Sequence, residues 1–148
     1  MKRLIDFAQF NFLPHSFDLG LLTLRLWLGL SLALLHGWGK LTGFSAMSDK
    51  FPDPLGVGSP ASLAMTVFGE FVCGALLALG LFTRFAAAVL VITMGVAFFV
   101  MHGASLKMGP GSGELAFVYL AGFVTLFLAG PGRFSLDAQL SRATVRGS

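Results

Sequence analysis

Residues 19–41, LGLLTLRLWLGLSLALLHGWGKL, decide the class of this chain because only Arg25, His36 and Lys40 interrupt a long apolar run. About 20 apolar residues, at 1.5 Å per residue, are needed to cross about 30 Å of hydrocarbon as a helix. The run does not alternate polar and apolar residues, so it lacks the period of a strand. A helix also satisfies all its backbone groups internally, which lipid requires. Residues 19–41 therefore predict a transmembrane helix.

Three more apolar runs follow, at about residues 62–82, 85–101 and 115–129, and within them the intramembrane carboxyl group of Glu70 stands alone. The composition agrees, with 55% hydrophobic and 11% charged residues and a mean hydropathy of +0.82. Soluble domains carry about a quarter charged residues. The 148 residues allow one domain at most. The prediction is an all-α integral membrane four-helix bundle, with residues 1–148 forming a single membrane domain.

The placement of Lys and Arg predicts the orientation. An even number of spans puts both termini on one side, together with Lys2, Arg3, Arg84, Arg133, Arg142 and Arg146. The opposite side carries Lys40, Lys50 and Lys107. Basic residues accumulate on the cytoplasmic side, so both termini are expected there, in a multi-pass membrane protein. The net charge of +3 is too small and too dispersed to indicate nucleic-acid binding, so no nucleic-acid partner is expected.

Ionisable residues inside the spans are the candidate functional groups, since such groups avoid lipid and face the bundle interior. At 100° per residue, Arg25, His36 and Lys40 fall on one helix face. Together with Glu70, His102 and Glu114, they are predicted to line one polar cavity that opens outward. Glu70 and His36 are the predicted catalytic pair, and the ligand-binding residues are Arg25, Lys40, His102 and Glu114.

Purely structural roles stay open for several of these groups. Arg25 can reach the inner headgroups or pair with Glu70 to fix helix packing. Glu70, if neutral, can donate a hydrogen bond to a carbonyl ligand, whereas a charged Glu70 would lock the helices together. His102 can be an ordinary helix-end residue. The single cysteine, Cys73, excludes an internal disulfide and is expected to pack.

Several short motifs, in order along nearly the whole chain, resemble the DoxX family of small bacterial membrane proteins. They are Leu24-Arg25, Gly29, His36-Gly37, Lys40-Leu41, Gly69-Glu70, Gly74, residues 80–84 (GLFTR), His102, Gly113-Glu114 and residues 130–137 (GPGRFSLD). The resemblance implies a four-helix membrane bundle. It also implies a redox association, because some members are subunits of quinone-linked oxidoreductases, including thiosulfate:quinone oxidoreductase. Others are partners of thiol-redox or detoxification proteins.

Three functions are compatible with these features. The first is a quinone-interacting or redox-accessory subunit, with a quinone as the cofactor that the resemblance implies and a redox protein as partner. The second is a haem- or metal-binding protein that uses His36 and His102, although no metal site is assigned. The third is a small-solute carrier or a structural protein that binds a partner. The sequence leaves open whether the chain is an enzyme on its own and whether it forms homo-oligomers in the bilayer.

Overall fold

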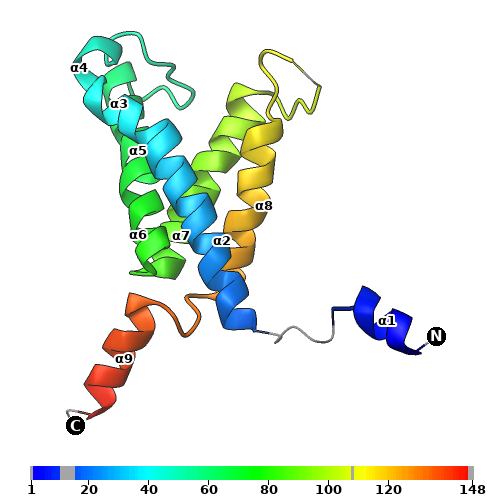
Figure 1. The fold of residues 1–148 in the computed structure, drawn as a ribbon. Coiled ribbons are helices and arrows are strands. Elements are labelled where there is room, and N and C mark those ends of the chain that lie inside the picture. Colours follow the sequence, from blue (N-terminus) through cyan, green and yellow to red (C-terminus); the bar gives the residue numbers. More distant parts are fainter. Residues whose placement is uncertain (1, 11–15, 108, 147–148) are drawn as a thin grey trace.

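The computed structural model describes residues 2–10, 16–107 and 109–146, and the regular structure in these ranges is helical, with no strand (Figure 1). The predicted all-α membrane class is confirmed. Four rods, each of one or more consecutive helices, form the body. Rod 1 is α2 (Phe17–Ser31), π-helical η1 (Leu32–Gly37) and α3 (Trp38–Thr42); rod 2 is α5 (Ser59–Val67), η2 (Phe68–Cys73) and α6 (Gly74–Leu79); rod 3 is α7 (Thr83–Gly95) and η3 (Val96–Met101); rod 4 is α8 (Glu114–Ala129). Outside the rods lie α1 (Lys2–Ala8), α4 (Phe44–Met47) and α9 (Leu136–Arg146).

Rods 1, 2 and 3 contain 26, 21 and 19 residues and are long and apolar enough to cross a membrane. Rod 4 is an apolar helix of 16 residues, or about 24 Å at 1.5 Å per residue. The chain is therefore a membrane protein with several apolar helices. The rods begin and end within three residues of the expected spans. Rod 2 differs most, because it begins and ends three residues earlier than expected; residues 80–82 then make the turn, and Thr83 and Arg84 already belong to α7.

Close backbone approach holds rod 1 against rod 2. A Cβ atom on Gly29 would lie 2.6 Å from the carbonyl oxygen of Gly74, and one on Gly37 would lie 2.7 Å from the backbone nitrogen of Phe71. In lipid, helices gain little from hydrophobic burial against one another, so small residues that allow van der Waals contact favour association. α2 packs mainly on α6, and α7 packs on α8. Between them lies an apolar core that includes Leu77, Leu90 and Phe123.

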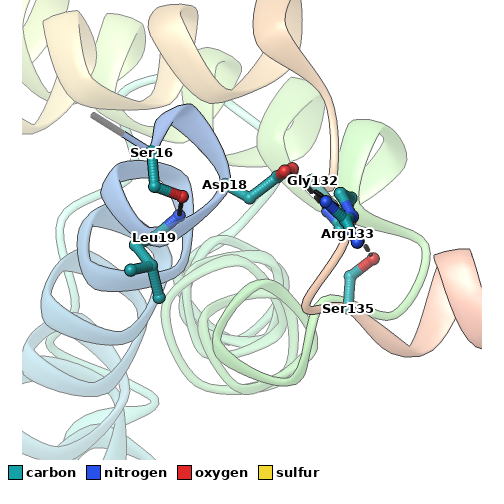
Figure 2. Close-up of polar contacts among 6 residues, drawn as sticks. All are labelled: Ser16, Asp18, Leu19, Gly132, Arg133 and Ser135. Atoms are coloured by element: carbon teal, nitrogen blue, oxygen red, sulfur yellow. Dashed lines mark hydrogen bonds and ion pairs between the residues drawn. The ribbon is translucent and has the colours of Figure 1, made fainter. Parts of the chain in front are cut away.

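The two ends of the bundle differ in their connections. Figure 1 shows the start of α2 and the whole of α9 at one end, here called the termini end; the loops with residues 48–58, 102–107 and 109–113 lie at the other, the loop end. At the termini end, residues 130–137 run beneath the rods. Figure 2 shows Asp18 accepting a hydrogen bond of 2.8 Å from the backbone N–H of Arg133, with its other carboxylate oxygen 3.9 Å from the guanidinium. In the same view, Ser16 caps α2 through the N–H of Leu19.

Candidate ligand-binding cleft

Two ionisable side chains of the loop half, Lys40 on α3 and Glu70 within η2, meet in a salt bridge. The distance between Lys40 Nζ and Glu70 Oε2 is 2.5 Å. The side chains are 21% and 11% exposed, respectively. A charged group in apolar surroundings is costly unless an opposite charge and hydrogen bonds compensate it. Each of these two residues supplies that compensation for the other.

The π-helical turns explain why Lys40, rather than His36, reaches Glu70. A π-helical hydrogen bond spans five residues instead of four, so such a turn contains one extra residue and changes the face that follows. The predicted face assumed a regular α-helix through residue 40. Across η1 the buried positions are instead Leu32, Ala33 and Gly37, while His36 is only half-buried. In the structure Lys40, and not His36, forms the ion pair with Glu70, while the predicted catalytic roles of His36 and Glu70 stay predictions.

The salt bridge forms part of the wall of a cleft of about 230 Å³ between rods 2 and 3. Two sides of the cleft come from these rods, and the loop that precedes α5 covers it. Its lining is Lys40, Phe51, Pro52, Pro54, Leu55, Ser62, Met65, Thr66, Glu70, Ile92, Thr93, Val96, Ala97 and Met101. Most of these side chains are apolar, so the cleft is an apolar site with one charged pair in its wall.

Three hydroxyl groups line the cleft, and each donates its proton to a protein acceptor. Thr66 donates to the carbonyl of Ser62 at 2.8 Å, and Thr93 donates to the carbonyl of Val89 at 2.9 Å. The hydroxyl of Ser62 donates to the carboxylate of Asp53 at 2.6 Å. These oxygens therefore keep lone pairs but have no proton left to offer a ligand.

Asp53 fastens the covering loop to the start of α5. Its carboxylate accepts hydrogen bonds from the N–H groups of Val57 and Gly58, at 3.0 and 2.7 Å, in addition to the one from Ser62. The bond from Ser62, followed by that from Gly58, holds the pKa of Asp53 below its usual value of 3.8. The neighbouring Pro52 and Pro54, which line the cleft, are thereby held at the N-terminus of α5.

The six predicted site residues do not gather around one cavity. Among the six, only Lys40 and Glu70 line the cleft. The ring of His36 packs edge-on against Tyr119, with 6.1 Å between centroids. His102 Nδ1 lies 3.0 Å from the carbonyl oxygen of Gly111, within the loop that follows rod 3. Glu114 is exposed in the first turn of α8. Their predicted binding and catalytic roles stay predictions.

Arg25 lies at the termini end, contrary to the expectation that it shares the cavity. It is 1% exposed, and its Nη2 donates a hydrogen bond of 2.7 Å to the carbonyl oxygen of Phe134. A Cβ atom on Gly80 would lie only 1.7 Å from Nη1, so the guanidinium occupies the space that a side chain there would need. Neither Nε nor Nη1 has a hydrogen-bond partner among the residues that the structure describes. Arg25 was expected either to reach the inner headgroups or to fix helix packing through Glu70. The structure agrees with a packing role, but the partner is the backbone carbonyl of Phe134 instead of Glu70.

Within the ranges that the structure describes, no group of three or more His, Cys, Asp or Glu side chains is placed to hold a metal ion. The two histidines considered as haem ligands have separate partners, Tyr119 for His36 and Gly111 for His102. The geometry therefore gives the haem or metal alternative no support.

Sequence reasoning missed the covering loop and Thr93. Asp53 stands between two prolines and shortly before Gly56 and Gly58, ahead of a helix, and this is a recognisable turn pattern. Thr93 has no such signal. It reaches rod 2 because Gly69 lacks a side chain, and a Cβ atom there would lie 2.6 Å from Thr93 Oγ1.

Comparisons with known proteins identify the family of this chain. The family model DoxX matches residues 20–103, which include both members of the salt bridge. An uncharacterized membrane protein of Mycobacterium tuberculosis is 36% identical over 119 residues, which cover 66% of this chain and 73% of the relative. Two uncharacterized Haemophilus influenzae proteins are 39% and 29% identical, over 70% and 73% of this chain and 78% and 73% of their own lengths. No solved structure matches significantly. The chain belongs to the DoxX family.

Proposed function

We propose that this protein is a quinone-interacting accessory subunit of a membrane redox system, and that the cleft between rods 2 and 3 is its ligand site. The observation that carries the proposal is the salt bridge between Lys40 and Glu70 in the wall of an otherwise apolar cleft. Ligand sites typically combine an apolar lining with a few polar groups that fix orientation. An oxygen-bearing ring on an apolar tail matches that combination.

The size of the cleft supports a ring-sized ligand. Its volume of about 230 Å³ is below the roughly 300–1,000 Å³ typical of sites for drug-sized molecules. It therefore suits a single substituted ring, with the remainder of the molecule outside.

The mouth of the cleft supports entry from the bilayer. Met65, Ile92 and Met101 line the cleft and are still 46%, 67% and 45% exposed. Exposed apolar side chains on membrane-spanning helices face lipid, so an isoprenoid or alkyl tail can extend between α5 and η3 into the acyl chains. The ring is then held by Lys40, whose ammonium donates to a ring oxygen.

A binding measurement tests this proposal. The purified protein in detergent is titrated with a decyl-substituted benzoquinone by isothermal titration calorimetry. We expect saturable binding that weakens roughly tenfold or more in Lys40→Met, since a hydrogen bond to a charged group contributes about 1.5–3 kcal/mol. Lys107→Met, which removes an exposed lysine outside the cleft, is the matched control and should bind as the wild type does. Absence of saturable binding by the wild type contradicts the proposed function.

The proposal includes the orientation in the bacterial inner membrane, with α9 and the start of α2 on the cytoplasmic side. The exposed Arg84, Arg133 and Arg142 at the termini end support it. Single cysteines at Ser48 and Ser112, in a Cys73→Ser background, should react with a membrane-impermeant thiol reagent added from outside. Reaction from the cytoplasmic side alone would reverse the orientation, while leaving the cleft proposal unaffected.

A further inference from the structure

The side chains that line the cleft have more unused hydrogen-bond acceptors than unused donors. Lys40 is the one lining side chain with N–H groups to offer, and one of them is committed to Glu70 Oε2. Among the residues that the structure describes, no hydrogen bond reaches Glu70 Oε1, and this oxygen is not one of the fully buried polar atoms that lack a partner. A carboxylate oxygen that faces a cleft is an acceptor without a donor.

The three lining hydroxyls increase this excess. The hydroxyl protons of Thr66 and Thr93 are held by carbonyls of their own helices, and that of Ser62 by Asp53. Each of these oxygens can only accept. A ligand that brings its own O–H group therefore meets several side-chain acceptors, whereas a ligand that can only accept finds, among the lining side chains, the ammonium of Lys40 as its donor.

We infer that the cleft selects the reduced, hydroxyl-bearing form of its ligand, a quinol, over the oxidised quinone. This inference rests on the proposed function. A quinol hydroxyl both donates and accepts, so one hydroxyl accepts from Lys40 Nζ and donates to Glu70 Oε1. The two groups are adjacent, with 2.5 Å between Nζ and Oε2. A quinone carbonyl satisfies Lys40 but removes water from the Glu70 carboxylate without replacing the lost hydrogen bond, which is costly.

The discrimination follows a general asymmetry in recognition. A site that is built to hydrogen-bond an O–H group rejects the analogue that lacks it, because its own polar groups are left unpaired. Here the atom left without a donor is one oxygen, Oε1, of the Glu70 carboxylate, whose other oxygen pairs with Lys40. The same argument predicts that any ring of equal shape without an O–H donor binds as poorly as the quinone.

The experiment is an anaerobic titration of the full-length protein in detergent with three decyl-substituted compounds: the benzoquinol, the benzoquinone and the dimethyl ether of the benzoquinol. We expect the quinol to bind roughly 10–100-fold more tightly than the quinone, in line with about 1.5–3 kcal/mol for a hydrogen bond to a charged group. The dimethyl ether should bind no better than the quinone. These comparisons use the wild type, so they do not depend on a variant that folds.

Glu70→Gln provides the matched test of mechanism. Its amide can still accept from Lys40, and its NH₂ group can donate to a carbonyl, so the preference should fall to within about threefold. Asp49→Asn, an exposed carboxylate outside the cleft, should keep the full preference.

The outcomes separate the two proposals. Equal affinity for quinol and quinone overturns the selectivity and leaves the proposed function in place, whereas no binding of either compound overturns both. Decanol supplies a hydroxyl and a tail without the ring. If it binds as tightly as the quinol, the assignment to a quinol is wrong.

Discussion

Arg25 and Lys40 are cationic side chains of the same rod, and their surroundings differ in one decisive respect. Arg25 is 1% exposed and is enclosed by Gly80, Ser135 and the carbonyl of Phe134, so its remaining N–H groups face only protein. Lys40 pairs with a carboxylate and lines a cleft of about 230 Å³. Both satisfy the rule that intramembrane charges face the bundle interior. What distinguishes a ligand site from a packing device is whether the unused hydrogen-bonding capacity is accessible.

The backbone differs in the same way between the two ends. At the termini end, rods 1, 2 and 3 are regular α-helices, and residues 80–82 form a tight turn. Towards the loop end, the same three rods contain the π-helical segments η1, η2 and η3. Single π-helical turns are rare and frequently occur at functional sites. Glu70 lies in one of them, and Val96, Ala97 and Met101 of the cleft lie in another.

The largest expected effect comes from filling the enclosed site. Gly80 has φ +69°, and a Cβ atom would lie 1.7 Å from Arg25 Nη1. Gly80→Ala should lower the free energy of unfolding by about 3 kcal/mol or more, combining left-handed backbone strain with overpacking. Gly20→Ala is the control, because an added Cβ atom there would have no described atom within 4 Å outside its own stretch of helix. A thermal unfolding midpoint for Gly80→Ala equal to the wild type would show that this end is not rigid.

The second effect comes from separating the charges of the cleft. Lys40→Met leaves the Glu70 carboxylate in an apolar wall and should destabilise the protein by about 2–3 kcal/mol, somewhat less than for a fully buried pair. Replacing both residues by Met should recover most of the loss while abolishing ligand binding. Stability is measured by denaturant titration in detergent micelles. If the double variant is as unstable as Lys40→Met, the two side chains stabilise the fold in some way other than by compensating each other's charge.

The same comparison shows what the sequence could predict. Apolar runs of about 20 residues identify transmembrane helices because lipid leaves few alternatives, and the rods begin and end near the expected positions. The ionisable residues of the spans were also identifiable. Their partners were not, because a helix-face argument assumes 100° per residue and η1 departs from it. The partner of Arg25 is a backbone carbonyl 109 residues away, which no side-chain pattern reveals.

A smaller effect is expected where residues 130–137 meet the turn beneath rods 2 and 3. Asp137 accepts hydrogen bonds from the N–H groups of Phe82 and Thr83, at 2.8 and 2.9 Å, and so caps α7. Asp137→Ala should cost about 1 kcal/mol, as for other lost caps. Asp49→Ala, an exposed carboxylate outside any helix cap, is the control.

This effect should depend on pH. Partial burial raises the pKa of Asp137, but hydrogen bonds from Thr83 and Phe82 and the charge of Arg25 outweigh it and leave the pKa below 3.8. A carboxylate with a lowered pKa stabilises the folded state above its unfolded pKa and loses that contribution as the pH falls through the folded value. The difference in unfolding midpoint between wild type and Asp137→Ala should therefore be constant above about pH 5 and shrink in stronger acid. A difference that grows in acid would contradict the assigned role.

The smallest effect is expected at the loop end, in the covering loop. Asp53→Asn keeps one acceptor oxygen but loses the other, so it should release the N–H of Gly58 while barely changing global stability. The local consequence is measurable by hydrogen exchange, where the amide of Gly58 should exchange roughly tenfold faster relative to its intrinsic rate, while the amide of Val57, bonded to the other oxygen, should keep its protection. Because the hydrogen bonds lower the pKa of Asp53, the wild-type protection should persist throughout the neutral range and weaken only in strong acid. If the covering loop closes the cleft, faster amide exchange in Asp53→Asn should coincide with faster release of the bound ligand. If exchange becomes faster while the rate of ligand release stays the same, Asp53 stabilises only the loop.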